Sequence, residues 1–170
     1  MDLIHLILNA PAFYIAAIVA VFATFMTITS TNPVHALLYL VSSLLAVAMI
    51  FFAVGAPFAG VLEVIVYAGA IMVLFVFVVM MLNLGEATIE QERAWLTPRI
   101  WIGPALLAGI LFGELLRVID SQPAHFAGAR EIGAKTVGIA LYGPYLLGVE
   151  LASMLLLAAL VAAYHLGKHD

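Results

Sequence analysis

Long apolar runs separated by short polar segments dominate the chain. Each run contains about the 20 residues that a helix needs to cross roughly 30 Å of hydrocarbon. The apolar positions are continuous rather than alternating, which favours helices over the period-two strands of membrane barrels. The pattern predicts an all-α integral membrane protein with a single membrane domain over residues 1–170. Its five predicted transmembrane helices cover approximately residues 10–28, 33–54, 60–82, 100–119 and 143–166.

The residues between the spans include several that begin or end helices. Asn32 is a capping residue and Pro33 suits a first helical position, so the second span is expected to begin there. Gly55–Pro57 is expected to form a tight turn into the third span, and Gly85 a left-handed cap after it.

Two predicted connections are long, residues 83–99 and 120–142. Pro104 and Pro144 are expected in the first turns of the fourth and fifth spans, where a missing N–H group does no harm.

Composition supports the membrane assignment and argues against several classes of function. Hydrophobic residues make up 66% of the chain and charged residues 9%, whereas a soluble domain carries about 25% charged residues. The formal net charge is −4 and no basic patch occurs, so nucleic-acid binding is not expected. The chain has no cysteine, which excludes disulfides, thiolate zinc sites and iron–sulfur ligation by this chain.

The basic residues do not orient the chain in the membrane. Five spans place the termini on opposite sides, and three basic residues fall on each side, which leaves the positive-inside rule without a decision. The two groups are Arg93, Arg99 and Lys168 on one side, and Arg117, Arg130 and Lys135 on the other.

Glu63 is the sharpest candidate for a functional residue. A carboxylate in a spanning helix costs roughly 2.5–3.5 kcal/mol on insertion scales, so such a group is expected to face protein or water. Tyr67 follows four residues later and shares its helical face, where the hydroxyl is positioned to hold the acid or extend a chain of waters. The alternative is that Glu63 lies near the interface and only anchors the helix end.

The small residues Ala68, Gly69 and Ala70 in the same span have two interpretations. Small side chains allow helix backbones to approach closely. A glycine that weakens the helix by about 1 kcal/mol also favours a π-bulge, a one-turn insertion that is common at functional sites.

Other ionisable residues are weaker candidates. Glu150 is expected about two turns into the fifth span, either as a proton-handling group or as a structural hydrogen-bonding group. Glu114 and Arg117, three residues apart, are expected to form a local ion pair. His35 is expected to cap or hydrogen-bond rather than bind metal, and a haem held by His35 and His165 is the remaining alternative.

Six segments of the chain form recognisable motifs: Asn32–Leu40, Glu63–Phe75, Met81–Leu84, Ile89–Arg93, Gly143–Tyr145 and Val149–Leu155. These segments resemble one membrane subunit of respiratory complex I, the family of NADH-quinone oxidoreductase subunit J, called chain 6 in mitochondria. The resemblance covers nearly the whole chain, and the third-helix motif is its most specific part.

The resemblance implies a non-catalytic subunit of an enzyme that transfers electrons from NADH to a quinone and pumps protons. FMN, iron–sulfur clusters and the quinone site are expected in other subunits, with no cofactor or metal in this chain. The implied partners are the K-type, H-type and A-type subunits and the antiporter-like N-type subunits. The implied location is the bacterial inner membrane, with a periplasmic N-terminus and a cytoplasmic C-terminus.

The resemblance also implies that the third helix switches between α-helical and π-bulged forms near Tyr67 and Gly69. Rotation of the helix would move apolar side chains such as Val73 and Phe75 into or out of a water path toward acids of the K-type subunit. Glu63 and Glu150 would then belong to the proton path. The competing interpretations are a channel or carrier subunit outside respiration, a membrane scaffold without a conducting role, and a cytochrome subunit.

Overall fold

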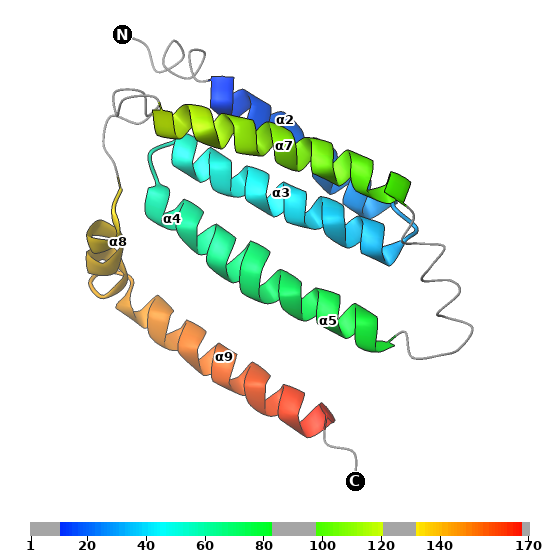
Figure 1. Ribbon diagram of the computed structural model, residues 1–170. Coiled ribbons are helices and arrows are strands. Elements are labelled where there is room, and N and C mark those ends of the chain that lie inside the picture. The colour runs from blue at the N-terminus through cyan, green and yellow to red at the C-terminus, as the bar shows by residue number, and fades with distance from the viewer. Residues whose placement is uncertain (1–10, 83–97, 121–131, 168–170) are drawn as a thin grey trace. The chain divides into compact units, whose positions relative to one another are not determined.

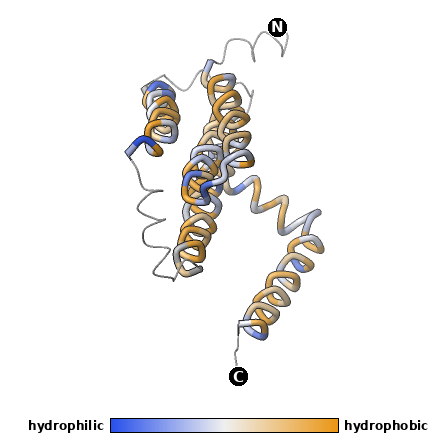
Figure 2. The backbone as a smooth tube through the Cα atoms, turned by 90° about the vertical axis from the view of Figure 1, so that its right-hand side faces the viewer, coloured by the Kyte–Doolittle hydropathy of each residue, from blue (hydrophilic) through white to orange (hydrophobic). Residues whose placement is uncertain are grey.

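A computed structural model describes residues 11–82, 98–120 and 132–167 as helices joined by short turns (Figure 1). Within these ranges, five continuous helical stretches are long and apolar enough to cross a membrane, and the third is Pro57–Val79. This confirms the predicted all-α protein with five spans. Hydrophobic residues run along the length of these helices (Figure 2). The elements are α2 (Pro11–Thr29), α3 (Pro33–Ala53), α4 (Pro57–Leu62), the π-helix η1 (Glu63–Ile71), α5 (Met72–Leu82), α7 (Pro98–Asp120), α8 (Ala134–Leu141) and α9 (Leu146–Gly167).

The chain divides into two compact units, Met1–Glu131 and Ile132–Asp170. The first contains α2 to α7, and the second contains α8 and α9. The single membrane domain stays a prediction. The expected cap at Gly85 falls outside the described residues.

Helix α3 is the centre of the first unit. It contacts α2, α4, η1, α5 and α7, and Figure 1 shows it between α7 and the continuous rod formed by α4, η1 and α5. The third span is therefore held in this unit mainly by its contacts with α3.

Small residues bring α2 and α3 close together. Ala16, Ala20 and Ala23 are buried on α2, where small side chains allow close approach of the two backbones. The Ser43 hydroxyl donates to the carbonyl oxygen of Ala20 at 3.3 Å and lies 2.7 Å from the Thr24 hydroxyl. Two hydroxyl-mediated contacts thus join the helices inside the apolar interface.

The beginning of α3 has the predicted cap. The Asn32 side-chain oxygen accepts from the backbone N–H groups of Val34 at 3.0 Å and His35 at 3.2 Å. Pro33 occupies the first turn, as expected.

The end of α3 is a Schellman motif. Gly55 has a φ of 81°, its N–H donates to the carbonyl oxygen of Phe52 at 3.2 Å, and the Ala56 N–H donates to that of Phe51 at 2.9 Å. Pro57 then begins α4. The predicted tight turn at Gly55–Pro57 is confirmed.

Helix α7 begins earlier than expected. It starts at Pro98, so Pro104 lies inside the helix and not in its first turn. The missing N–H of Pro104 removes the intrahelical bond to the carbonyl group of Ile100. The prediction failed because it placed the helix start near Ile100 and did not use Pro98 as a first-turn proline.

The second unit differs from its predicted form. Residues Ala134–Leu141, expected within a loop, form α8. Helix α9 begins at Leu146, which places Pro144 in the preceding turn and not in the first turn of the span. Glu150 consequently lies about one turn into α9, whereas two turns were expected.

Candidate functional site

The third span contains a π-helix in its middle. Residues Glu63–Ile71 form η1, which is nine residues long and lies between α4 and α5. The Met72 N–H, directly after η1, donates to the carbonyl oxygen of Tyr67, a bond across five residues that defines π-helical winding. The predicted π-bulge is confirmed, and the segment is longer than the single turn expected.

Gly69 fits a close approach within this π-helix. A β-carbon added at Gly69 would lie 3.1 Å from the backbone oxygen of Val64. That separation is tighter than an ordinary van der Waals contact, so a side chain at this position would require Val64 to shift. The glycine therefore matches the π-helical winding itself, in addition to lowering the stability of an α-helix.

Glu63 lies at the start of η1, next to a tight contact between α4 and α3. Its N–H donates to the carbonyl oxygens of Ala59 and Gly60. A β-carbon on Gly60 would lie 3.0 Å from the backbone oxygen of Ala48 and 3.0 Å from the ring of Phe52. The third span is thus held closely against α3 one turn before the carboxylate, which is itself half-buried.

The side chains of Glu63 and Tyr67, which the sequence suggested as partners, are not joined by a direct hydrogen bond in the described part of the chain. Tyr67 is 50% exposed, and within the described part of the chain no hydrogen bond joins its hydroxyl to the Glu63 carboxylate. Both residues remain on η1, four positions apart. A link between them would need water or a group from another subunit.

The residues after η1 differ sharply in exposure. Met72 is 2% exposed, whereas Val73 is 67% and Phe75 is 53% exposed. The two side chains expected to gate the water path therefore lie on the outer surface of the first unit, and Met72 supplies the buried contact.

Glu150 belongs to the second unit, where α9 has no buried residue. The Ser153 hydroxyl donates to the backbone carbonyl oxygen of Glu150 at 2.8 Å and not to its carboxylate. The exposed Glu150 side chain is available for a group outside this unit.

The ion pair expected on α7 is confirmed. Arg117 Nη1 lies 3.2 Å from Glu114 Oε1. Glu114 is only 7% exposed, a burial that the sequence interpretation missed. The signal was its spacing from Leu107 and Leu111, two buried residues that share its helical face.

His35 makes local contacts of the expected kind. Its Nδ1 lies 3.4 Å from the Ser30 hydroxyl oxygen, and its ring centre lies 4.8 Å from that of Tyr39. Tyr39, which sequence reasoning did not single out, is buried with its hydroxyl where a β-carbon of Gly103 on α7 would stand. Within the described ranges no group of three or more His, Cys, Asp or Glu side chains could hold a metal ion.

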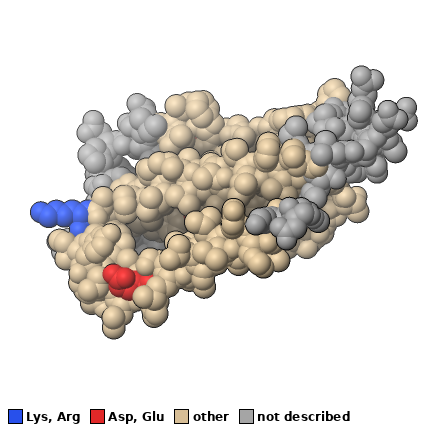
Figure 3. All heavy atoms as spheres, turned by 90° about the horizontal axis from the view of Figure 1, so that it is seen from below, with Lys and Arg blue, Asp and Glu red and all other residues tan. Residues whose placement is uncertain are grey.

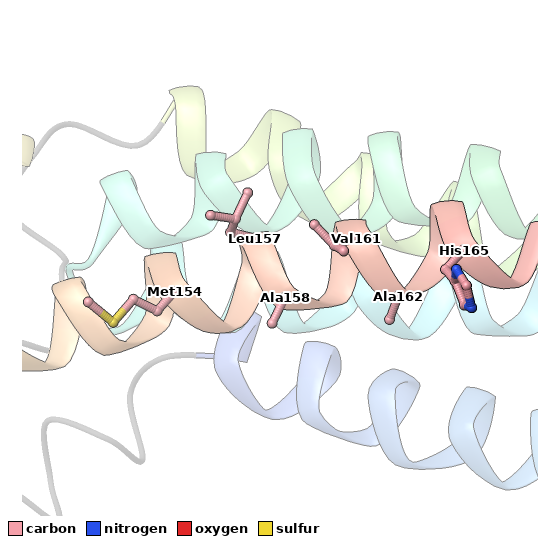
Figure 4. A pocket seen from close by; sticks show the side chains of 6 residues that line it. All are labelled: Met154, Leu157, Ala158, Val161, Ala162 and His165. Carbon is pink, nitrogen blue, oxygen red and sulfur yellow. The ribbon is translucent and has the colours of Figure 1, made fainter.

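An open depression lies along α9 in the described part of the second unit (Figure 4). Apart from a single imidazole, its lining offers no polar side chain for binding a cofactor. The lining residues are Met154, Leu157, Ala158, Val161, Ala162 and His165.

Charged side chains are rare on the face that Figure 3 shows, where most described atoms belong to uncharged residues. The described parts of the spanning helices contain three carboxylates, Glu63, Glu114 and Glu150, of which Glu114 is paired with Arg117. Such acids in a membrane are functional candidates by default.

The fold and the site define a multi-pass helical membrane protein whose third span is π-helical around a glycine. Residues 23–166 match the family model described as NADH-ubiquinone/plastoquinone oxidoreductase chain 6, and the chain belongs to this family. It is thus a membrane subunit of an NADH-quinone oxidoreductase.

Bacterial relatives agree with the family match. The chain is 69% identical over 160 residues to NADH-quinone oxidoreductase subunit J of Pseudomonas aeruginosa, covering 94% of this chain and 96% of the relative. It is 60% identical over 159 residues to subunit J of Escherichia coli K12, covering 94% and 86%. Subunit J of Buchnera aphidicola from Schizaphis graminum is 51% identical over 159 residues, covering 92% and 96%. The spanning helices and these relatives support a multi-pass bacterial membrane protein.

Proposed function

We propose that this subunit couples quinone reduction to proton translocation by acting as a conformational gate. The third span would alternate between the π-helical form and an α-helical form, and the change would open or close a water path. The observation that carries the proposal is the π-helix Glu63–Ile71 in the middle of a membrane span. π-Helical segments are rare and occur frequently at functional sites.

The exposure pattern after η1 supports a rotary gate. Conversion of π-helical to α-helical winding changes the number of residues per turn, so the side chains that follow must rotate about the helix axis. Rotation would move the buried Met72 away from its contacts and carry Val73 and Phe75 to new positions. An apolar side chain that enters the path would stop proton transfer by excluding water.

The close contact at Gly60 supports the proposal that α4 stays fixed while the residues after it rotate. Its close approach to Ala48 and Phe52 holds α4 against α3 immediately before Glu63. Motion is therefore expected to begin at η1 and to be transmitted to α5, with Tyr67 and Gly69 at the part of the helix that rewinds.

Glu63 and Glu150 are the acids of this chain that we assign to the proton path. Both are in spanning helices, and both leave part of the side chain exposed on their own unit. The nearest acceptors would come from a K-type subunit, with H-type, A-type and antiporter-like N-type subunits as further neighbours.

The redox groups would lie outside this chain. It has no cysteine for iron–sulfur ligation, and its described part has no metal-binding cluster. On the family resemblance, we assign FMN, the iron–sulfur clusters and the quinone site to other subunits. The chain would be oriented with its N-terminus in the periplasm and its C-terminus in the cytoplasm.

Glu63→Gln and Glu150→Gln test the role of the acids. An amide keeps the shape of the side chain but does not release a proton at physiological pH. In the assembled complex, the proposal predicts unchanged NADH oxidation by artificial acceptors and reduced proton pumping. A membrane scaffold would tolerate both changes, so full pumping by both variants would favour a purely structural role.

A further inference from the structure

The segment that leads into α9 has an unusual surface for a connection between membrane spans. Connections normally run through water and carry polar residues. Between Ile132 and Tyr145, however, the only charged residue is Lys135. The large apolar or aromatic side chains exposed in this segment are Ile132, Ile139, Leu141, Tyr142 and Tyr145.

The length of α9 fixes where this segment must lie. Its 22 residues correspond to about 33 Å, close to the roughly 30 Å thickness of the hydrocarbon layer. Leu146 consequently lies at one boundary of that layer. Helix α8 ends at Leu141, only a short turn away, so it must remain near the same boundary.

The turn between the two helices is tightly built. The Tyr145 N–H donates to the carbonyl oxygen of Ala140 at 3.2 Å, and the Leu146 N–H donates to that of Gly143 at 3.2 Å. A β-carbon on Gly143 would lie 2.8 Å from the carbonyl oxygen of Ile139, so a glycine is required at this point. These contacts hold α8 next to the start of α9.

From these observations we infer that α8 and its turn lie in the headgroup layer of the bilayer, with a phospholipid surface as their partner. Tyrosines are enriched at this depth because the ring is apolar and the hydroxyl is polar. Tyr142 and Tyr145 occupy that position directly before the span, and Ile139 and Leu141 face the outer part of the acyl chains. The ammonium group of Lys135 reaches the phosphates on its flexible stem.

Lipid fits this surface better than water because large apolar side chains are exposed next to a spanning helix. It also fits better than a neighbouring protein subunit, because the segment pairs a cation with tyrosines at a fixed membrane depth. Exposed apolar patches mark membrane or protein interaction sites, and the continuity with α9 decides between the two.

Photo-crosslinking in the intact complex, in its native membrane, tests the inference. Ile139 and Tyr142 are replaced, one at a time, by the photoreactive residue p-benzoylphenylalanine. After illumination, the mass of this subunit is measured. Both positions are predicted to gain the mass of a phospholipid, with no gain in samples kept in the dark.

A covalent link to another subunit at these positions would overturn the inference in favour of a protein partner. Illumination that adds no lipid at either position would overturn it in favour of a segment in water. Assembly of each variant is checked by native electrophoresis, and Leu141 serves as a third labelling position if one variant fails to assemble.

Discussion

A β-carbon on Gly69 would lie 3.1 Å from the carbonyl oxygen of Val64, five positions earlier in the same helix. The two residues lie within one π-helical segment, where hydrogen bonds join residues five apart. The lack of a side chain at position 69 thus avoids a tight contact within the π-helix.

Gly69→Ala is predicted to shift the third span toward α-helical winding. The added methyl group strains the contact with Val64, and alanine favours an α-helix by about 1 kcal/mol relative to glycine. The measurement is a cryo-electron microscopy map of the assembled variant complex. The bond between the Met72 N–H and the Tyr67 oxygen is expected to be lost or weakened.

Gly109→Ala is the matched control for this change. Gly109 also lies in a spanning helix, but a β-carbon there meets no atom within 4 Å in the described part of the chain. The third span of this control is expected to keep its π-helix. An unchanged π-helix in Gly69→Ala as well would show that the glycine does not set the winding.

Gly103→Ala is predicted to destabilise the contact between α3 and α7. The new methyl group would occupy the space taken by the Tyr39 hydroxyl, and overpacking of this kind costs about 1–3 kcal/mol. The measurement is the midpoint temperature of complex disassembly, which is expected to fall.

Tyr39→Phe in the same chain is predicted to restore part of that loss. It removes the hydroxyl, but the ring carbon that carries it still lies 3.0 Å from the β-carbon position of residue 103. Partial rescue is therefore expected. Two independent, additive losses in the double variant would contradict the proposed contact.

Asn32→Ala is predicted to weaken the start of α3. The side chain accepts two backbone hydrogen bonds, and loss of such a cap costs typically about 1 kcal/mol. Resistance of the turn between α2 and α3 to limited proteolysis in membranes is expected to decrease. Asn32→Asp retains the acceptor oxygen and should behave like the unmodified chain; equal cleavage of the Ala and Asp variants would argue against capping.

Substitutions of the two residues in the α7 ion pair are predicted to reduce stability by unequal amounts. Arg117→Ala leaves the buried Glu114 carboxylate without the partner at 3.2 Å, whereas Glu114→Gln removes the buried charge and keeps an acceptor. The arginine variant should therefore lose more stability, by about 1–3 kcal/mol, in thermal disassembly of the complex. A larger loss in Glu114→Gln would mean that the buried charge itself is stabilising.

Local chemistry explains which parts of this fold were predictable. The spans follow from runs of apolar residues, and the ends of α3 follow from Asn32, Pro33 and Gly55, whose effects act within a few residues. The π-helix was predictable only as one of two interpretations of Ala68–Ala70, until the family resemblance favoured it.

The unpredicted features depend on contacts between distant residues. The burial of Glu114 follows from the packing of the α7 face, and the fit of Tyr39 over Gly103 joins residues 64 positions apart. Helix α8 is short and has few polar residues, so its apolar and polar positions show no clear helical periodicity that would distinguish it from a loop. The nine-residue length of η1 likewise depends on backbone geometry and cannot be predicted from the spacing of residue types in the sequence.

The most direct test of the proposed gate is the proton-to-electron stoichiometry of the intact complex carrying Gly69→Leu, measured in membrane vesicles beside Gly109→Leu. The account predicts that both variants oxidise NADH with artificial acceptors at the normal rate. Gly69→Leu should move fewer protons per electron transferred to quinone, while Gly109→Leu should match the unmodified complex. An unchanged stoichiometry in Gly69→Leu would contradict the gate.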